Sequence, residues 1–164
     1  MILDNSYSDI WKKFIDSFKI SSVSLKDRSQ TGKKMFSLSK KYWRDLHSLV
    51  DVDLQTIFDY VKNIPYVEDN IGTEVIARPK YLLDPNIFPG LDCKKKAILI
   101  GSWAEAHSIP YRYLAVSEKK DGVIHHVFPQ LFLENEWKIV DATYPQYQLF
   151  GLKDFISNGE ELPQ

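Results

Sequence analysis

The stretch Gly90-Leu91-Asp92-Cys93-Lys94-Lys95-Lys96-Ala97 carries the single cysteine of this 164-residue chain. A proline and a glycine interrupt whatever precedes it, and Asp92 is a preferred N-cap residue. The chain then continues to about His107 without a proline, which predicts a helix that begins at Cys93. Unpaired backbone N–H groups and the positive end of the helix dipole stabilise a thiolate at such a position. We therefore expect Cys93 to be nucleophilic.

Three consecutive lysines, Lys94 to Lys96, follow the cysteine in the first helical turn. Positive charge opposes the helix dipole there, so the run breaks a local rule without an evident structural gain, and such breaks tend to mark functional sites. The lysines also place positive charge beside the thiol, which favours the thiolate. The opposing interpretation is that a lone cysteine is a small buried hydrophobe, its commonest role.

Candidate partners of the thiol lie downstream. His125 and His126 stand in a predicted strand, and Asp141 follows fifteen positions after the second histidine, on the next predicted strand. Cysteine, histidine and aspartate in this order are the parts of a thiol catalytic triad. Because successive strand residues point to opposite faces, only one of the two histidines can face the Cys93 helix. A bulge at Pro129 would reverse that alternation.

Four ordered blocks of the chain resemble the transglutaminase-like superfamily, whose core is related to that of papain-like thiol enzymes. The blocks are Asp92-Cys93-Lys94-Lys95-Lys96-Ala97, Ser108-Ile109-Pro110-Tyr111-Arg112, His126-Val127-Phe128-Pro129-Gln130-Leu131-Phe132-Leu133 and Trp137-Lys138-Ile139-Val140-Asp141-Ala142-Thr143. The resemblance implies an α+β fold with helices packed on a small antiparallel sheet. It also selects Cys93, His126 and Asp141 as the triad. We assign Asp92 and His125 to oxyanion or supporting positions, and a surface position is the alternative for His125.

The chemistry that this resemblance implies is acyl transfer on an amide, with no cofactor. Cys93 would attack the carbonyl carbon, His126 would protonate the leaving amine, and Asp141 would orient the imidazole. The backbone N–H of Cys93 would be one oxyanion donor. A protein or peptide substrate and hydrolysis by water, as in a cysteine peptidase or amidase, are the favoured interpretation. A cross-linking transglutaminase and an inert scaffold, within a larger assembly such as a virion, are the alternatives.

Composition excludes several other functional classes. The net charge is -1 and the lysines are spread along the chain, so we expect no nucleic-acid partner. A single cysteine permits no intrachain disulfide and leaves a CxxC zinc site unsupported, so we expect no metal. No apolar stretch is long enough to span a bilayer and no signal peptide is evident. These features predict a cytoplasmic protein, or a virion-associated one if the source is a phage, with no membrane partner.

The length and the 44% hydrophobic content suit one domain over residues 1–164. We divide it into an N-terminal helical extension (1–50), a transglutaminase-like catalytic core (51–145) and a C-terminal tail (146–164). Apolar periodicity, caps and breakers predict the remaining elements. These are a helix from Ser8 to Lys19, a loop from Ser21 to Lys41, helices over Lys41–Val50 and Asp53–Lys62, and a long loop from Tyr66 to Phe88 with a helical turn near Tyr81.

Three strands should follow the cysteine helix as an antiparallel meander. They are Tyr111–Ser117, Val123–Leu133 and Trp137–Asp141, with turn residues between them. The tail from Tyr144 to Gln164 should add peripheral packing, a helical piece over Leu152–Ile156 and a frayed end.

Overall fold

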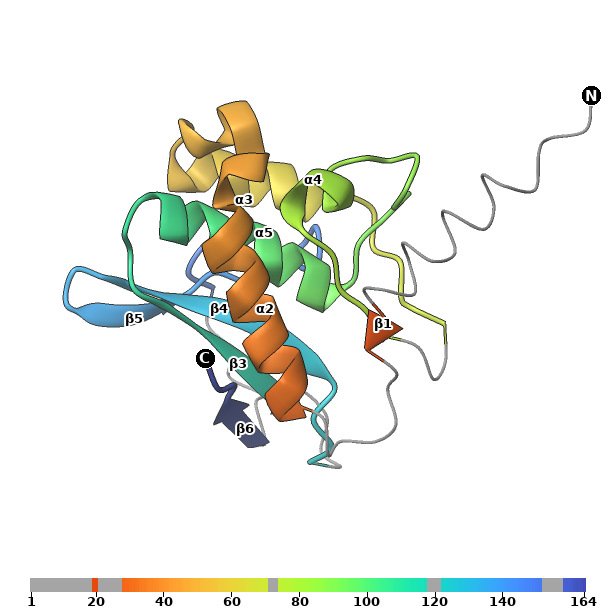
Figure 1. The fold of residues 1–164 in the computed structure, drawn as a ribbon. Coiled ribbons are helices and arrows are strands. Elements are labelled where there is room, and N and C mark those ends of the chain that lie inside the picture. The colour runs from red at the N-terminus through yellow and green to blue at the C-terminus, as the bar shows by residue number, and fades with distance from the viewer. Residues whose placement is uncertain (1–18, 21–27, 71–73, 118–121, 152–157) are drawn as a thin grey trace, which may run out of the picture.

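A small antiparallel sheet with helices packed against it forms the protein in the computed structural model, which describes residues 19–20, 28–70, 74–117, 122–151 and 158–164 (Figure 1). This arrangement confirms the predicted α+β class. The elements in chain order are β1 (Lys19–Ile20), α2 (Arg28–Tyr42), the 3-10 helix η2 (Trp43–Val50), α3 (Leu54–Asn63), β2 (Glu74–Val75), α4 (Pro79–Leu82), α5 (Cys93–Ala106), β3 (Tyr111–Ser117), β4 (His126–Leu133), β5 (Glu136–Ile139) and β6 (Asn158–Glu161).

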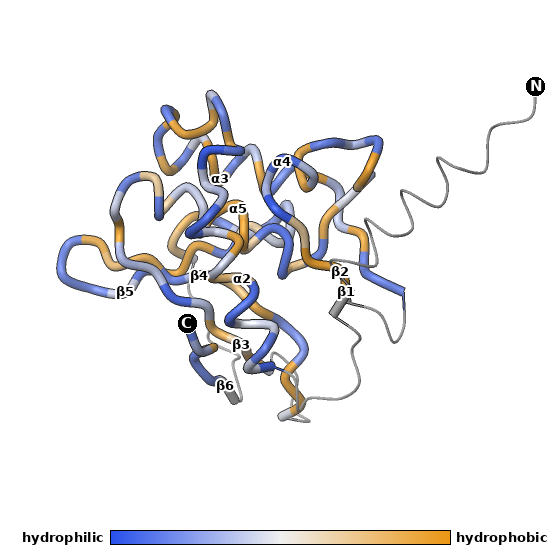
Figure 2. The backbone as a smooth tube through the Cα atoms, in the orientation of Figure 1, coloured by the Kyte–Doolittle hydropathy of each residue, from blue (hydrophilic) through white to orange (hydrophobic). Residues whose placement is uncertain are grey.

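The main sheet has four antiparallel strands in the order β5-β4-β3-β6, and β1 and β2 form a separate two-stranded pair. Strands β3, β4 and β5 confirm the predicted meander. The register of β3 against β4 runs from Tyr111 opposite Leu131 to Val116 opposite His126. Figure 2 shows the tip of the β4–β5 hairpin as hydrophilic, as expected for a solvent-facing turn.

Pro129 lies inside β4 without a bulge, opposite Tyr113 of β3. Its carbonyl oxygen accepts a hydrogen bond from the Val140 N–H at 3.0 Å, on the β5 side. The N–H and C=O of one residue in an antiparallel ladder point to the same neighbour. The N–H that proline lacks would therefore have faced β5, so the β3–β4 ladder loses nothing and the side-chain alternation of β4 is kept.

Helix α5 is the central element of the fold. It contacts α2, η2, α3 and α4 as well as strands β3 and β4 (Figure 1). Every residue from Lys95 to Ala104 is buried, so this helix has no solvent-facing stripe. The helix passes close to β3 at Gly101, because a Cβ atom there would lie 2.0 Å from the Tyr113 hydroxyl oxygen.

The helices cover one face of the main sheet. Tyr111 and Tyr113 are two positions apart on β3 and share a face. Both rings pack on Phe36 of α2, with ring centroids 5.3 Å and 4.7 Å apart. On the β4–β5 hairpin, Phe132 and Trp137 are each 38% exposed and their rings pack together at 5.2 Å.

The expectation of a loop from Ser21 to Lys41 is wrong from residue 28 onward, because α2 occupies residues 28–42 and packs on α5, and residues 21–27 lie outside the described residues. Its buried side includes Gly32 and Ser39, which do not register as apolar in a sequence pattern. A Cβ on Gly32 would lie 2.7 Å from the Leu162 Cβ atom. The Ser39 hydroxyl lies 2.6 Å from the Tyr113 hydroxyl and donates to the Ile98 carbonyl oxygen at 3.2 Å. Close packing and specific hydrogen bonds stabilise this helix where hydrophobicity is weak.

The frayed C-terminal end is also a wrong expectation. Residues 158–161 form β6, which pairs with β3 and is itself an edge strand of the sheet. The next residue, Leu162, is buried, and its N–H donates to the Tyr113 carbonyl oxygen at 2.8 Å. The predicted helical piece over residues 152–156 lies outside the described residues.

The helical half confirms some expectations and corrects others. Asp53 caps α3 by accepting a hydrogen bond from the Thr56 N–H at 2.7 Å, and α4 provides the helical turn near Tyr81. The helix expected over residues 41–50 is instead the end of α2 followed by η2, with His47 at a φ of 51°. Of the helix expected over residues 8–19, only the last residue is described, and it belongs to β1. Among the described residues, no helix combines the length and the apolar character needed to cross a membrane.

Candidate active site

Cys93 is the first residue of α5, as the sequence predicts. Asp92 caps the helix, because its side chain accepts a hydrogen bond from the Lys95 N–H at 3.0 Å. The cysteine is buried, with 6% of its surface exposed. Its thiol therefore lies among the unpaired N–H groups of a helix N-terminus and largely out of water.

The turn before Cys93 is pressed against an earlier segment of the chain. The Leu91 N–H donates to the Pro65 carbonyl oxygen at 2.9 Å, and the Val67 N–H donates back to the Leu91 carbonyl oxygen at 3.4 Å. A Cβ on Gly90 would lie 2.5 Å from a methyl carbon of Val67 and 2.7 Å from the Pro65 oxygen. Only glycine fits here, so Gly90 lets residues 65–67 run directly beside the helix start.

His126 and Asp141 form a buried pair. The His126 Nε2 atom lies 2.7 Å from the Asp141 Oδ2 atom, and the two residues are 5% and 2% exposed. The other carboxylate oxygen of Asp141 accepts a hydrogen bond from the Thr143 N–H at 3.0 Å. Two partners therefore fix the orientation of the carboxylate, and the carboxylate in turn fixes the imidazole ring.

Cys93 is the other partner of the imidazole. Burial by itself would lower the pKa of His126, but hydrogen bonds to Asp141 and to Cys93, together with their negative charges, outweigh it and raise the pKa to about 10. Because Nε2 is bonded to Asp141, the ring nitrogen left for the sulfur is Nδ1. The structure thus brings together the three side chains that the sequence selects as a triad.

His125 lies apart from this group. It precedes β4, its side chain is exposed, and its Nδ1 atom lies 2.8 Å from the Val123 carbonyl oxygen. Its backbone N–H donates to the Val116 carbonyl oxygen at 3.1 Å, where the pairing of β3 with β4 ends. The surface position considered for His125 is therefore the one that the structure has.

Asp92 serves the helix start and does not supply a hydrogen-bond donor. Burial raises the pKa of Asp92, but the charges of Lys94 and Lys95 and the hydrogen bonds from Lys95 outweigh it, so the pKa is lowered. An ionised carboxylate has no proton to donate to an oxyanion. Its contacts make it the cap of α5 and the anchor of two lysines.

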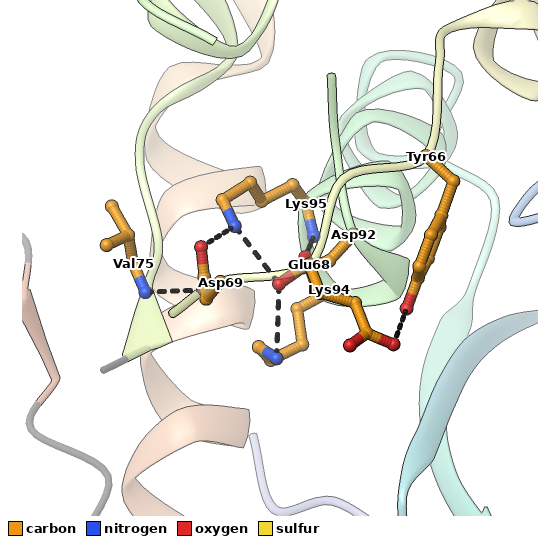
Figure 3. A network of polar contacts seen from close by, with 7 residues as sticks. All are labelled: Tyr66, Glu68, Asp69, Val75, Asp92, Lys94 and Lys95. Atoms are coloured by element: carbon orange, nitrogen blue, oxygen red, sulfur yellow. Dashed lines mark hydrogen bonds and ion pairs between the residues drawn. The ribbon is translucent and has the colours of Figure 1, made fainter. Parts of the chain in front are cut away.

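The three lysines after Cys93 have structural partners, so the expectation that they bring no structural gain is wrong. Figure 3 shows Lys95 between two carboxylates, with its ammonium 2.6 Å from Asp69 and 3.0 Å from Asp92, while Lys94 lies 3.2 Å from Asp92. Asp69 also accepts a hydrogen bond from the Val75 N–H at 2.8 Å. Lys95 thereby ties the chain around β2 to the start of α5.

Tyr66 and Tyr144 are further residues beside His126, and the sequence patterns single out neither of them. Tyr144 stacks on His126 with ring centroids 6.3 Å apart, and Tyr66 packs on Tyr144 at 4.9 Å. Burial, followed by the charge of Cys93, raises the pKa of Tyr66, so its phenol stays protonated. Its hydroxyl lies 3.4 Å from a carboxylate oxygen of Glu68, a long contact (Figure 3). No sequence signal marks Tyr66, because it reaches the site only through the pairing of residues 65–67 with Leu91.

Within the part of the chain that the structure describes, no three histidine, cysteine or acidic side chains gather as they would to hold a metal ion. The side chains that the structure places at the site are a thiol, an imidazole, a carboxylate and two neighbouring phenols.

Comparison with models of protein families and with curated proteins gives no match. Among solved structures, a candidate cysteine protease from Cytophaga hutchinsonii is similar to 86% of this chain, with 19% sequence identity and a TM-score of 0.40. The similar region is 43% of that chain, so this protein spans less than half the length of its structural neighbour.

Proposed function

We propose that this protein is a thiol acyl-transfer enzyme with a transglutaminase-like core, and that it acts as a cysteine peptidase or amidase through Cys93, His126 and Asp141. The observation that carries the proposal is the buried hydrogen bond between His126 and Asp141, joined to a cysteine at a helix N-terminus. A purely structural cysteine does not need a buried histidine held by a buried carboxylate. The ordered sequence blocks that resemble this superfamily point to the same three residues.

The reaction would begin with the Cys93 thiolate and the His126 imidazolium. The sulfur attacks the amide carbon, a C–S bond forms, and the carbonyl electrons move onto oxygen. When the tetrahedral intermediate collapses, the C–N bond breaks and His126 gives its proton to the leaving nitrogen. Neutral His126 then removes a proton from water, which attacks the thioester, releases the acid and restores the thiolate. Asp141 holds the ring and stabilises its charged form.

The developing oxyanion needs hydrogen-bond donors. The N–H of Cys93 is one, because the first N–H groups of a helix have no partner within it. We assign the phenol of Tyr66 as a second donor. It belongs to the segment that runs beside the helix start, it is protonated, and its present contact with Glu68 is long. An oxyanion is a stronger acceptor than a distant carboxylate oxygen and would attract this hydroxyl.

Product analysis tests the reaction class. Incubation with casein or with a mixed peptide library should create new amino termini, and Cys93→Ala should abolish them. His125→Ala is the matched control for His126→Ala, because it removes the neighbouring imidazole and should leave activity intact. Incorporation of a labelled primary amine without cleavage would assign the protein to the cross-linking transglutaminases. A protein with neither activity, and with a slowly alkylated thiol, would be the inert scaffold, which could serve in a virion or another assembly.

A further inference from the structure

Lys96 is a buried lysine that the proposed reaction does not use. It lies on α5 three residues after Cys93, and only 1% of it is exposed. Its ammonium donates to two backbone carbonyl oxygens, those of Thr143 at 2.9 Å and Lys62 at 3.2 Å. Moving an ammonium out of water is costly, and carbonyl oxygens offset that cost less well than a carboxylate does. Burial of the Lys96 ammonium at this cost suggests that the lysine has a role beyond packing.

The two carbonyl groups belong to different parts of the site. Lys62 lies in the last turn of α3, where a cation is favoured by the helix dipole. Thr143 follows Asp141 by two positions, and its N–H donates to the Asp141 carboxylate. Thr143 is therefore held at both ends, by Asp141 through its N–H and by Lys96 through its C=O. This chain of hydrogen bonds joins the acid of the triad to α5.

Electrostatic coupling follows the same path. Burial lowers the pKa of Lys96 to about 8, and the negative charge of Asp141 opposes that decrease. The coupling is mutual, so the ammonium favours the ionised form of Asp141. The Lys62 ammonium, on the residue whose carbonyl oxygen Lys96 binds, is paired with Asp59 at 2.9 Å.

We infer that Lys96 is a positioning residue of the proposed triad, which fastens the turn bearing Asp141 to the helix bearing Cys93. Residues three apart on a helix lie on the same side of it. One rigid turn of α5 therefore fixes the position of Thr143, which holds Asp141, relative to the sulfur of Cys93. Lys96 touches neither the sulfur nor the imidazole in this scheme, and it acts through Thr143 and Asp141. The inference rests on the proposed function, because Lys96 has this role only if Asp141 orients His126.

A double-mutant cycle separates positioning from simple packing. Lys96→Met keeps the length and the apolar stem of the side chain and removes both hydrogen bonds and the charge. It is made in the wild-type protein and in Asp141→Asn, and the rate of Cys93 alkylation by iodoacetamide is measured near neutral pH. Lys96→Met should slow alkylation by about tenfold in the wild-type background and by less than about twofold in the Asp141→Asn background.

Two controls accompany the double-mutant cycle, one for the loss of charge and one for folding. Lys94→Met removes the same charge from the same helical turn, but Lys94 pairs with Asp92, so alkylation should stay within about twofold of wild type. Circular dichroism and urea unfolding establish that each variant is folded. If Lys96→Met does not fold, Lys96→Leu carries the cycle, since it also removes the charge and both hydrogen bonds.

The outcomes are separable from those of the proposed function. Equal slowing by Lys96→Met in both backgrounds, or no slowing in either, overturns the role of Lys96. If Asp141→Asn itself leaves alkylation unchanged while His126→Ala slows it, the acid assignment fails and the inference fails with it. If wild-type Cys93 is alkylated slowly and neither histidine matters, the proposed catalytic function is what has failed.

Discussion

Replacing the Cys93 thiol should change how the stability of the protein depends on pH. His126 has its pKa raised in the folded state from 6.5 to about 10, after burial is outweighed by Asp141 and Cys93. A base with a raised pKa contributes stability that is fully present below the unfolded pKa and is lost as the pH rises toward the folded pKa. Taken alone, His126 would therefore reduce the free energy of unfolding by up to about 1.4 kcal/mol per pH unit above pH 6.5.

The proposed ion pair cancels this dependence in the wild-type protein. Between pH 6.5 and the ionisation of an unfolded cysteine near pH 8.5, the folded pair would hold one proton, on the imidazole. The unfolded chain also holds one proton on these two groups, on the sulfur. Equal proton numbers mean no slope. In Cys93→Ala the sulfur is gone from both states, and the pKa of His126 loses the part of its increase that Cys93 supplies. Asp141 still favours the imidazolium, so the folded variant keeps a proton that the unfolded histidine releases.

Urea unfolding across this window measures the difference. From pH 6.5 to about pH 8, Cys93→Ala should lose about 1 to 2 kcal/mol of stability relative to wild type. The other titrating groups are common to both proteins and cancel in the difference. Cys93→Ala/His126→Gln is the control, and its stability relative to wild type should be flat over the same range. Parallel curves for wild type and Cys93→Ala would show that the native thiol keeps its proton, and the ion pair would have to be abandoned.

Three further predictions concern the same region. Alkylation of wild-type Cys93 by iodoacetamide should persist below neutral pH, His126→Ala should shift it to alkaline pH, and an unchanged profile in that variant would contradict the pair. Tyr66→Phe should slow acylation by p-nitrophenyl acetate by at least about tenfold while leaving alkylation, which forms no oxyanion, within about twofold, and equal changes in both rates would rule out the oxyanion role. Lys95→Met should destabilise the protein by about 3 to 5 kcal/mol because it removes the buried lysine that binds both Asp69 and Asp92, and Lys94→Met, whose side chain is partly exposed, should lose far less. Unfolding in urea measures both variants, and similar losses would refute the burial argument.

The parts of the site that the sequence predicts are those with a local signature. A capping aspartate before a stretch without proline predicts the start of α5. The strand patterns and the turn residues between them predict the meander that carries His126. The selection of His126 over His125 came from the resemblance to a known superfamily. The structure agrees on a physical ground, because His125 lies before the strand and bonds to its own loop.

What the sequence does not reveal is packing that depends on small or polar residues. Helix α2 lacks a strong apolar stripe because its close contacts use Gly32 and its hydrogen bonds use Ser39. Tyr66 reaches the site through backbone pairing with Leu91, and no local pattern encodes that contact. Strand β6 is short and polar, and only its pairing with β3 makes it a strand.

The sequence predicts that the three lysines after Cys93 lie at the candidate site and bring no structural gain. The location agrees with the structure, but the lack of a structural gain does not. Positive charges at a helix N-terminus oppose the dipole, yet each of these side chains has a partner that offsets the cost. Lys94 and Lys95 bind carboxylates, and Lys96 reaches the carbonyl oxygen of Thr143. With two of the three charges neutralised by Asp92 and Asp69, the field that acts on the thiol comes mainly from the unpaired N–H groups of α5 and from His126. Lys95 and Lys96 then join neighbouring segments of the chain to the helix whose first residue is Cys93.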